Sequence, residues 1–167
     1  MRSFLIKSSL ITAFLILFLI TLGIGMAVMA PFRPGNLLFP IQYFSEQQVK
    51  IVYNSPVHRS SYTLDILERR INDLSARTGT KYELIALTYL DRAIDQATLA
   101  ISVVPQEEVG DLRDRLLSLA QRADEALKLL SIAPVDNSSI FIAFRTKIQL
   151  LMREGGLSCR RSGAVPS

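Results

Sequence analysis

Few side chains of this chain belong to the types that carry out chemistry. His58 is the only histidine and Cys159 the only cysteine. A zinc site at His58 would need carboxylates alone as its other ligands, because no second histidine and no cysteine cluster is present. We therefore interpret His58 as a solvated or partner-contacting side chain. A single thiol cannot close an internal disulfide. Cys159 is interpreted as an unactivated thiol, with an intermolecular disulfide as the alternative.

Acidic residues offer a second kind of chemistry. Asp91 and Asp95 are four residues apart and share a helical face, and Glu83 lies near it. Paired carboxylates act as acid and base in glycoside cleavage or bind a hard cation. Arg92 stands between them, however, and acids on exposed helices are ordinary. Without a second histidine for a catalytic triad or a glycine-rich phosphate loop, we assign no catalytic, cofactor-binding or metal-ligating residue and expect a protein that is not an enzyme.

The charges are placed evenly over most of the chain. Fifteen Lys and Arg fall between Arg33 and Arg153, and all fifteen Asp and Glu between Glu46 and Glu154. The region is therefore neutral and has no basic surplus to follow a phosphate backbone, so we expect no nucleic-acid partner. Within it, the run from Glu68 to Arg70 followed by Asp73 predicts ion pairs inside one helix, each worth only tenths of a kcal/mol.

The most prominent element is the uncharged apolar run from Leu10 to Met29. At about 1.5 Å per residue it can cross a hydrocarbon core of about 30 Å. Arg2 and Lys7 precede it, which favours a cytoplasmic N-terminus and an extracytoplasmic C-terminal part. We predict a single-pass anchor over residues 10–30 in the cell membrane, after a short cytoplasmic segment, 1–9. Gly23 and Ala27 have the spacing at which two such helices approach closely, so a homodimer through the anchor is one prediction.

A cleaved signal peptide is the alternative interpretation of the same run. Val28 and Ala30, or Gly25 and Ala27, provide small residues for a cleavage site. The apolar run is longer than the usual 7–15 residues of such peptides, and cleavage after Ala30 would leave Pro31 at the new terminus. These features favour a retained anchor.

After a linker at 31–36, helical periodicity continues to the end, and no alternating run predicts a strand. We expect helices from Pro40 to about Tyr53, Pro56 to Thr78, Lys81 to Val103 and Gln106 to Leu130. A fifth is capped by Asp136 or Asn137 and closed by Gly155-Gly156. Ser55 is a predicted N-cap, Gly79 a helix end, and Thr80 with Glu83 a capping box. Glu107, Glu108 and Asp111 are expected in the first turns of the fourth helix.

Apolar stripes on these helices predict the core. The first helix carries Ile41, Phe44, Val49, Ile51 and Val52, and the clearest stripe belongs to the fourth helix, with Leu116 and Leu119 near its centre. Arg113 lies on the opposite face and is expected to be exposed. Short connections make successive helices antiparallel. The predicted fold is all-α, with a bundle of about four to five helices over residues 37–155 and a disordered tail at 156–167.

One part of this region resembles a known family. The pattern consists of Pro34-Gly35, Phe39-Pro40, Glu46, Ser55-Pro56, Arg59 and Leu67-Glu68-Arg69-Arg70. It resembles a bacterial extracytoplasmic helical domain family of unknown function that follows a transmembrane helix, sometimes in anti-sigma-factor-like proteins. Gln42 stands where the family usually has lysine. The resemblance covers about a quarter of the chain and implies a helical extracytoplasmic module without catalytic residues. Only nine residues precede the apolar run, too few for a folded sigma-binding domain.

These observations predict a membrane-anchored extracytoplasmic helical module that senses or binds another protein, with no cofactor. Two alternatives have different partners. The chain is either an accessory subunit of a larger membrane complex, or, if the N-terminal run is cleaved, a secreted helical ligand-binding protein. An unrecognised pocket between helices would place it among enzymes or small-ligand binders.

Overall fold

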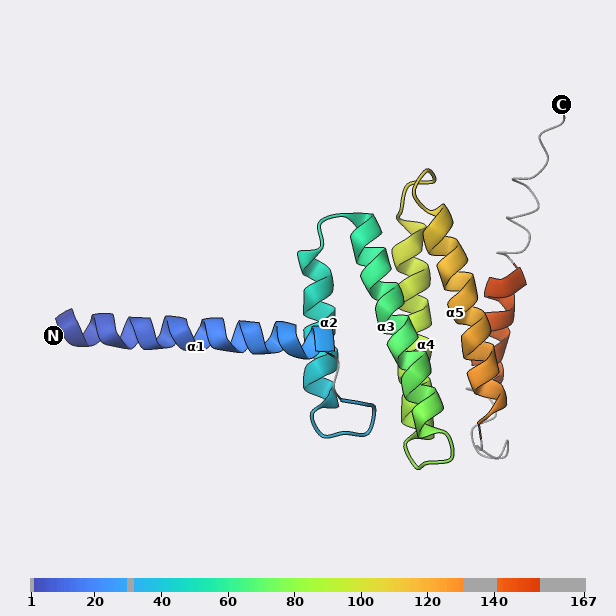
Figure 1. The fold of residues 1–167 in the computed structure, drawn as a ribbon, viewed down its shortest axis with the longest axis horizontal. Coiled ribbons are helices and arrows are strands. Elements are labelled where there is room, and N and C mark those ends of the chain that lie inside the picture. Colours follow the sequence, from blue (N-terminus) through green and yellow to red (C-terminus); the bar gives the residue numbers. More distant parts are fainter. Residues whose placement is uncertain (1, 30–31, 131–140, 154–167) are drawn as a thin grey trace. The chain divides into compact units, whose positions relative to one another are not determined.

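A computed structural model describes residues 2–29, 32–130 and 141–153, and in the first helix it describes the side chains of 11–25 and of 29. All regular structure in these ranges is helical and none is strand, which confirms the all-α class (Figure 1). The predicted cap at Asp136 or Asn137, the end at Gly155-Gly156 and the tail with Cys159 lie outside the described residues. The chain divides into two compact units, Met1–Val52 and Tyr53–Ser167.

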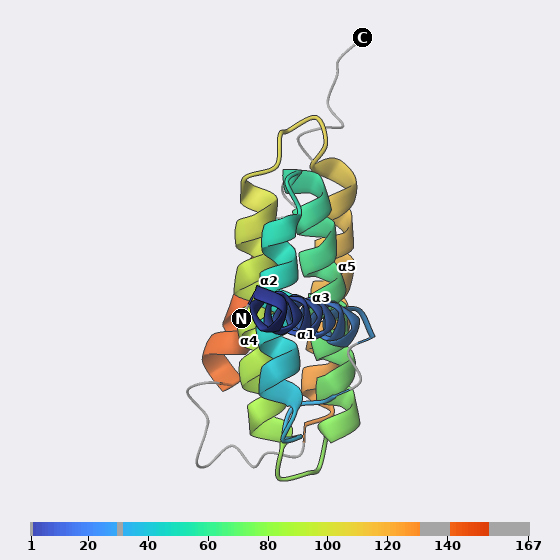
Figure 2. The same cartoon turned by 90° about the vertical axis from the view of Figure 1, so that its left-hand side faces the viewer.

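The first unit contains α1 (Arg2–Met29) and α2 (Phe39–Val52). The two helices cross, and a Cβ added at Gly23 of α1 would lie 3.6 Å from Ser45 Oγ of α2 (Figures 1 and 2). The turn before α2 passes through Gly35, whose φ of 90° is one that glycine adopts without strain. Helix α2 starts one residue before the predicted Pro40, because Phe39 N–H already bonds Asn36 O.

Among the helices of the described residues, none has the combined length and apolarity needed to span a membrane.

The predicted core stripe of α2 is wrong. Ile41, Phe44, Ile51 and Val52 are between 53% and 75% exposed, and the buried side chains of this helix include Gln42 and Glu46. Gln42 Nε2 donates to Glu46 Oε1 over 3.1 Å and Gln42 Oε1 accepts from Phe32 N–H over 2.8 Å. The polar side is therefore satisfied inside the fold, which allows it to be the buried one.

The second unit is an antiparallel bundle. Helices α3 (Pro56–Arg77) and α4 (Glu83–Ser102) form the predicted hairpin, and α5 (Gly110–Lys128) packs mainly against α3 (Figure 2). Residues 141–153 are also helical, and Phe144 and Ile148 enter the same core. Ser60 Oγ on α3 donates to Ala100 O on α4 over 2.8 Å, which ties the hairpin together.

The core of this bundle agrees with the predicted stripes. Leu64, Leu67 and Leu74 of α3 are fully buried. They form one cluster with Leu87, Leu90, Ile94, Leu116 and Leu119. The period of 3–4 residues in the sequence is therefore the period of burial for α3, α4 and α5.

The turn between α3 and α4 differs from the predicted capping box. Gly79 ends α3 with a φ of 74°, as predicted. Thr80 N–H, however, already bonds Arg77 O, so Glu83 accepts from Gly79 N–H instead, over 2.6 Å. As a result α4 begins at Glu83 and not at Lys81. Ser55 occupies the N-cap position of α3 without a side-chain cap bond.

The start of α5 was also predicted too early. Pro105 O accepts from Glu108 N–H in a turn, and the helix begins only at Gly110. Glu107 and Glu108 therefore precede the helix, and Asp111 is the acidic residue of its first turn. Val104 and Val109, on either side of this turn, are both buried. The turn brings two apolar side chains that are five residues apart into the same core.

Candidate functional site

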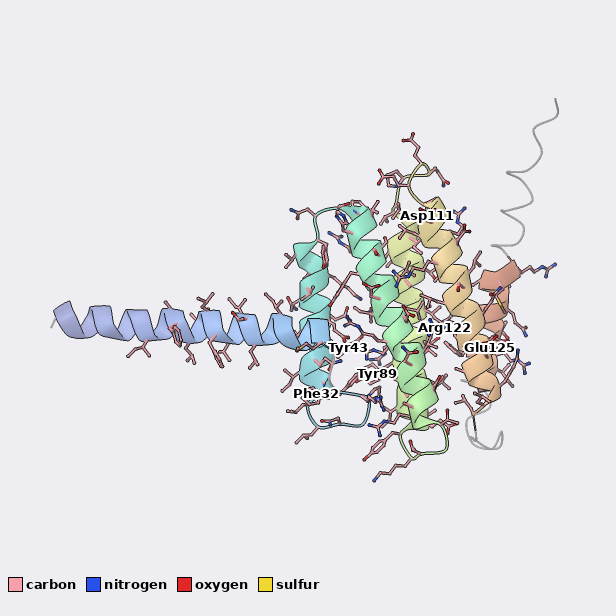
Figure 3. The ribbon with its side chains drawn as sticks, viewed as in Figure 1. Phe32, Tyr43, Tyr89, Asp111, Arg122 and Glu125 are labelled. Carbon is pink, nitrogen blue, oxygen red and sulfur yellow. The ribbon has the colours of Figure 1, made fainter. Side chains whose placement is uncertain are left out.

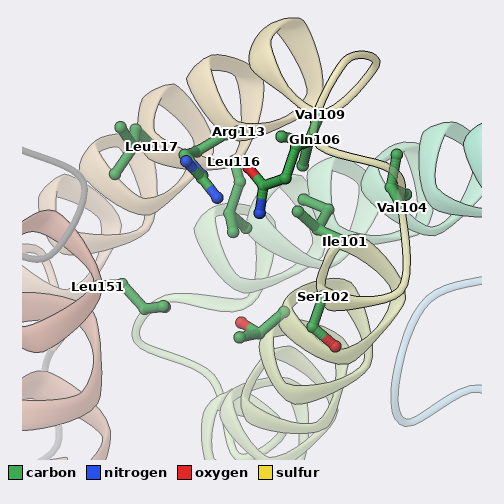
Figure 4. Close-up of a pocket in the computed structure, with 10 residues that line it drawn as sticks. Ile101, Ser102, Val104, Gln106, Val109, Arg113, Leu116, Leu117 and Leu151 are labelled. Carbon is green, nitrogen blue, oxygen red and sulfur yellow. The ribbon is translucent and has the colours of Figure 1, made fainter. Parts of the chain in front are cut away.

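A pocket of about 310 Å³ lies where α4, the following turn and α5 meet (Figure 4). Its apolar lining includes Ile101, Val104, Val109, Leu116 and Leu117, and Leu151 contributes from the C-terminal helix. Helix α4 ends at Ser102 and α5 begins at Gly110, so the segment between them, with its turn at residues 105–108, redirects the chain beside the pocket. The volume is at the lower limit for a small-molecule site.

Polar groups stand at the edge of this pocket. Thr98, Ser102 and Gln106 line it together with Arg113. The expected exposure of Arg113 is therefore wrong: the side chain is half-buried and lies along the pocket wall (Figure 4). It does so because α5 begins at Gly110, so that Arg113 belongs to the first turn beside the redirected chain. A mostly apolar lining that also includes a guanidinium and hydroxyls suits a small amphiphile with an anionic or polar head.

The predicted carboxylate pair is engaged by a cation from another helix. Lys147 Nζ bonds Asp91 Oδ1 and lies 2.9 Å from Asp95 Oδ1. Burial alone would lower the pKa of Lys147, but the hydrogen bonds that it donates to Asp91 and Asp95, together with their negative charges, outweigh burial and raise this pKa. Glu83 does not join them, because it caps the preceding turn. The two aspartates therefore hold the C-terminal helix against α4. Lys147 is 52 to 56 residues away, and no local pattern indicated it.

The predicted ion pairs around Glu68 are partly intrahelical. Arg70 Nη1 and the Asp73 carboxylate form the expected pair within α3, 2.7 Å apart, with Arg70 almost fully buried. Glu68 instead pairs with α5, at 2.6 Å from Arg122 and 3.3 Å from Arg115. Arg122 is labelled on α5 in Figure 3. Arg115 also bonds Asp65, over 2.7 Å. The hydrogen bond from Arg122 lowers the pKa of the Glu68 carboxyl. This network fixes the register of α3 against α5.

We expect Glu68→Gln to lower stability by under about 1 kcal/mol at pH 7, since the network is more than a third exposed and screened by solvent. The pKa of Glu68 is lower in the folded than in the unfolded protein. The carboxylate therefore adds to the free energy of unfolding at any pH above the unfolded pKa of about 4.3. This stabilisation is lost as the pH falls through the folded pKa. Urea unfolding at several pH values measures this. The difference between parent and variant should shrink in acid; a difference that grows would contradict it. Glu125→Gln, at an exposed position of α5, is the control.

The remaining candidates stay apart from these groups. His58 is exposed near the start of α3. Within residues 2–29, 32–130 and 141–153, no group of three or more His, Cys, Asp or Glu is placed to hold a metal ion. Arg92, between the two aspartates, turns away to lie 5.8 Å from the ring centre of Tyr89.

The first unit presents a different kind of surface. The large side chains of α1 from Ile11 to Ile24 are half or more exposed, among them Phe14 at 73% and Leu17 at 62%. They point in all directions around the helix. Such a helix, apolar all round, is normally buried in a large core or in lipid.

The chain matches no protein-family model, no curated protein and no solved structure. The resemblance to the extracytoplasmic helical family therefore stays a prediction.

Proposed function

We propose that this protein is a membrane-anchored helical interaction module, held by α1 and presenting its bundle on the extracytoplasmic side. The observation that carries the proposal is the exposed apolar circumference of α1. From Ser8 to Phe32 the sequence has no charged residue, a length of about 38 Å at 1.5 Å per residue if wholly helical. Lipid is the solvent that such a surface requires.

The mechanism is tethering. A helix that holds the bundle at a membrane surface confines it near neighbouring membrane proteins, and confinement raises its effective concentration for them. The Asp91–Asp95–Lys147 and Glu68–Arg115–Arg122 clusters use their charges to join helices of the bundle, a structural role that fits a rigid module without catalysis. An accessory subunit of a larger membrane complex has the same architecture and differs in its partner.

A second candidate function is supported by the pocket at the α4–α5 turn. Its volume of about 310 Å³ and its rim of Arg113, Ser102 and Gln106 suit a small amphiphilic ligand. In this case the chain is a binder of such a ligand, and the module reports ligand occupancy to its neighbour.

A measurement of membrane topology tests whether the protein is an anchored module with its bundle on the extracytoplasmic side. In a Cys159→Ser background, Ser118→Cys places one thiol at an exposed position of α5. We expect an impermeant thiol reagent to label it in intact spheroplasts, since Arg2 and Lys7 favour a cytoplasmic N-terminus. The chain should also remain in the membrane pellet after carbonate washing. Labelling only after lysis would reverse the orientation, and a soluble product beginning near Pro31 would establish a cleaved signal peptide.

A further inference from the structure

Helix α2 has its apolar side outward. Its apolar face consists of Ile41, Phe44, Ile51 and Val52, which are 53%, 63%, 69% and 75% exposed. Phe44, Ile51 and Val52 follow Ile41 by 3, 10 and 11 residues, which places all four along one side of the helix, with the exposed Gln48 between them. The opposite side carries Gln42 and Glu46, both 0% exposed. A surface helix of a soluble domain has the reverse arrangement.

The position of the crossing between α1 and α2 indicates the depth of this face in the membrane, if α1 spans it. Gly23 of α1 contacts Ser45 in the middle of α2, and Gly23 is six residues before Met29, the last residue of α1. At 1.5 Å per residue, the crossing lies about 9 Å inside the end of α1. The two helices run across one another in Figure 1, and Figure 2 shows α1 almost end-on in front of α2. A helix that crosses a membrane-spanning one at this level lies in the plane of the interface, where amphipathic helices insert their apolar face by about 5–10 Å.

The charges of the same unit fit a phospholipid surface. Among residues 32–52, Arg33 is exposed and Lys50 half-buried, while the acidic residue Glu46 is buried. Cations beside an apolar face are attracted by anionic headgroups. Leu37, in the turn before α2, is a further exposed apolar side chain of this unit, at 90%.

We propose that α2 is an interfacial membrane helix whose apolar face enters the lipid at the boundary of headgroups and acyl chains. This inference rests on the proposed anchoring by α1. The medium that covers this face is the bilayer, because α1 and α2 contact each other in one compact unit and both expose large apolar side chains. The consequence is that two crossed helices, and not α1 alone, hold the first unit at the membrane.

Tryptophan fluorescence tests the proposal directly, because the chain contains no tryptophan. Phe44→Trp and Ile51→Trp place one indole each on the apolar face of α2, and Leu17→Trp places one on α1. Leu99→Trp, at a position 70% exposed on α4, is the control outside the first unit. Each full-length variant is reconstituted in vesicles of neutral and anionic phospholipids whose acyl chains are brominated close to the carbonyl end or close to the methyl end. Unchanged helical circular dichroism verifies folding.

We expect the emission of Phe44→Trp and Ile51→Trp to be blue-shifted and to fall several-fold with lipids brominated near the carbonyl end. Leu17→Trp should be quenched more by the deep label, and Leu99→Trp by neither. Quenching of Leu17→Trp without quenching on α2 would overturn the interfacial helix and leave the anchor standing. A blue shift on α2 without lipid quenching would mean that protein, such as a second copy, covers the face, which also overturns it. No lipid quenching of Leu17→Trp would overturn anchor and interfacial helix together.

Discussion

Replacing Leu17 and Ile20 of α1 by arginine should remove the full-length chain from the membrane fraction. Each arginine at the centre of a membrane helix costs about 2.5–3.5 kcal/mol on the insertion scale, so the pair costs about 5–7 kcal/mol. Both side chains are more than half exposed, so no packed core is disturbed by the change. The fraction of protein that remains in the pellet after carbonate extraction is the measurement.

The matched control for this pair is Leu17→Val with Ile20→Val, which keeps both positions apolar and should stay in the pellet. Retention of the double arginine variant would mean that lipid does not surround this part of α1. It would equally refute the tethering proposal, since the anchor would then contribute nothing to membrane association.

Leu119→Ala should destabilise the bundle by about 2–5 kcal/mol, toward the upper end of that range. The side chain is 3% exposed and belongs to the core shared by α3, α4 and α5. Its truncation loses the transfer free energy of the removed atoms and leaves a cavity among rigid helices. Leu116→Ala should cost less within the same range, because Leu116 already lines the pocket and its loss enlarges an existing space. Urea unfolding of the full-length chain in mild detergent measures both.

Ser118→Ala is the control for these two leucines, because Ser118 is exposed on the same helix and should change stability by under about 0.5 kcal/mol. Equal, small effects at all three positions would show that the α5 stripe does not face a packed core. A larger cost at Leu116 than at Leu119 would mean that the pocket closes in solution around Leu116.

The local elements of this protein could be predicted because their signals are local. Pro56 and Gly79 mark the two ends of α3, since proline fits a first helical turn and glycine accepts a φ of 74°. The three-to-four spacing of leucines identified the buried side of α3, α4 and α5. Helices α4 and α5 begin at Glu83 and Gly110, two and four residues later than predicted, because hydrogen bonds within the preceding turns compete with the helix.

The site could be predicted only in part, because its groups come from distant segments. The spacing of Asp91 and Asp95 predicts that they share a helical face. Their partner Lys147 is more than fifty residues away, and only the packing of the helices brings it to them. The pairing of Glu68 with Arg122 and the half-buried place of Arg113 in the pocket also depend on how separate helices pack together. Side-chain pairs between helices depend on the register in which the helices pack, and this register cannot be predicted from the spacing of residues along one helix.

The amino-acid sequence by itself determined where helices form in this protein, which residues make their apolar stripes and that the charges between residues 33 and 154 balance. Only the tertiary structure decided which stripe is buried. In α5 the apolar side of Leu119 is in the core, whereas in α2 the apolar side of Phe44 is outside and Glu46 is inside. Periodicity places like residues on one side of a helix, but whether that side meets protein or another medium depends on what the rest of the chain packs against it.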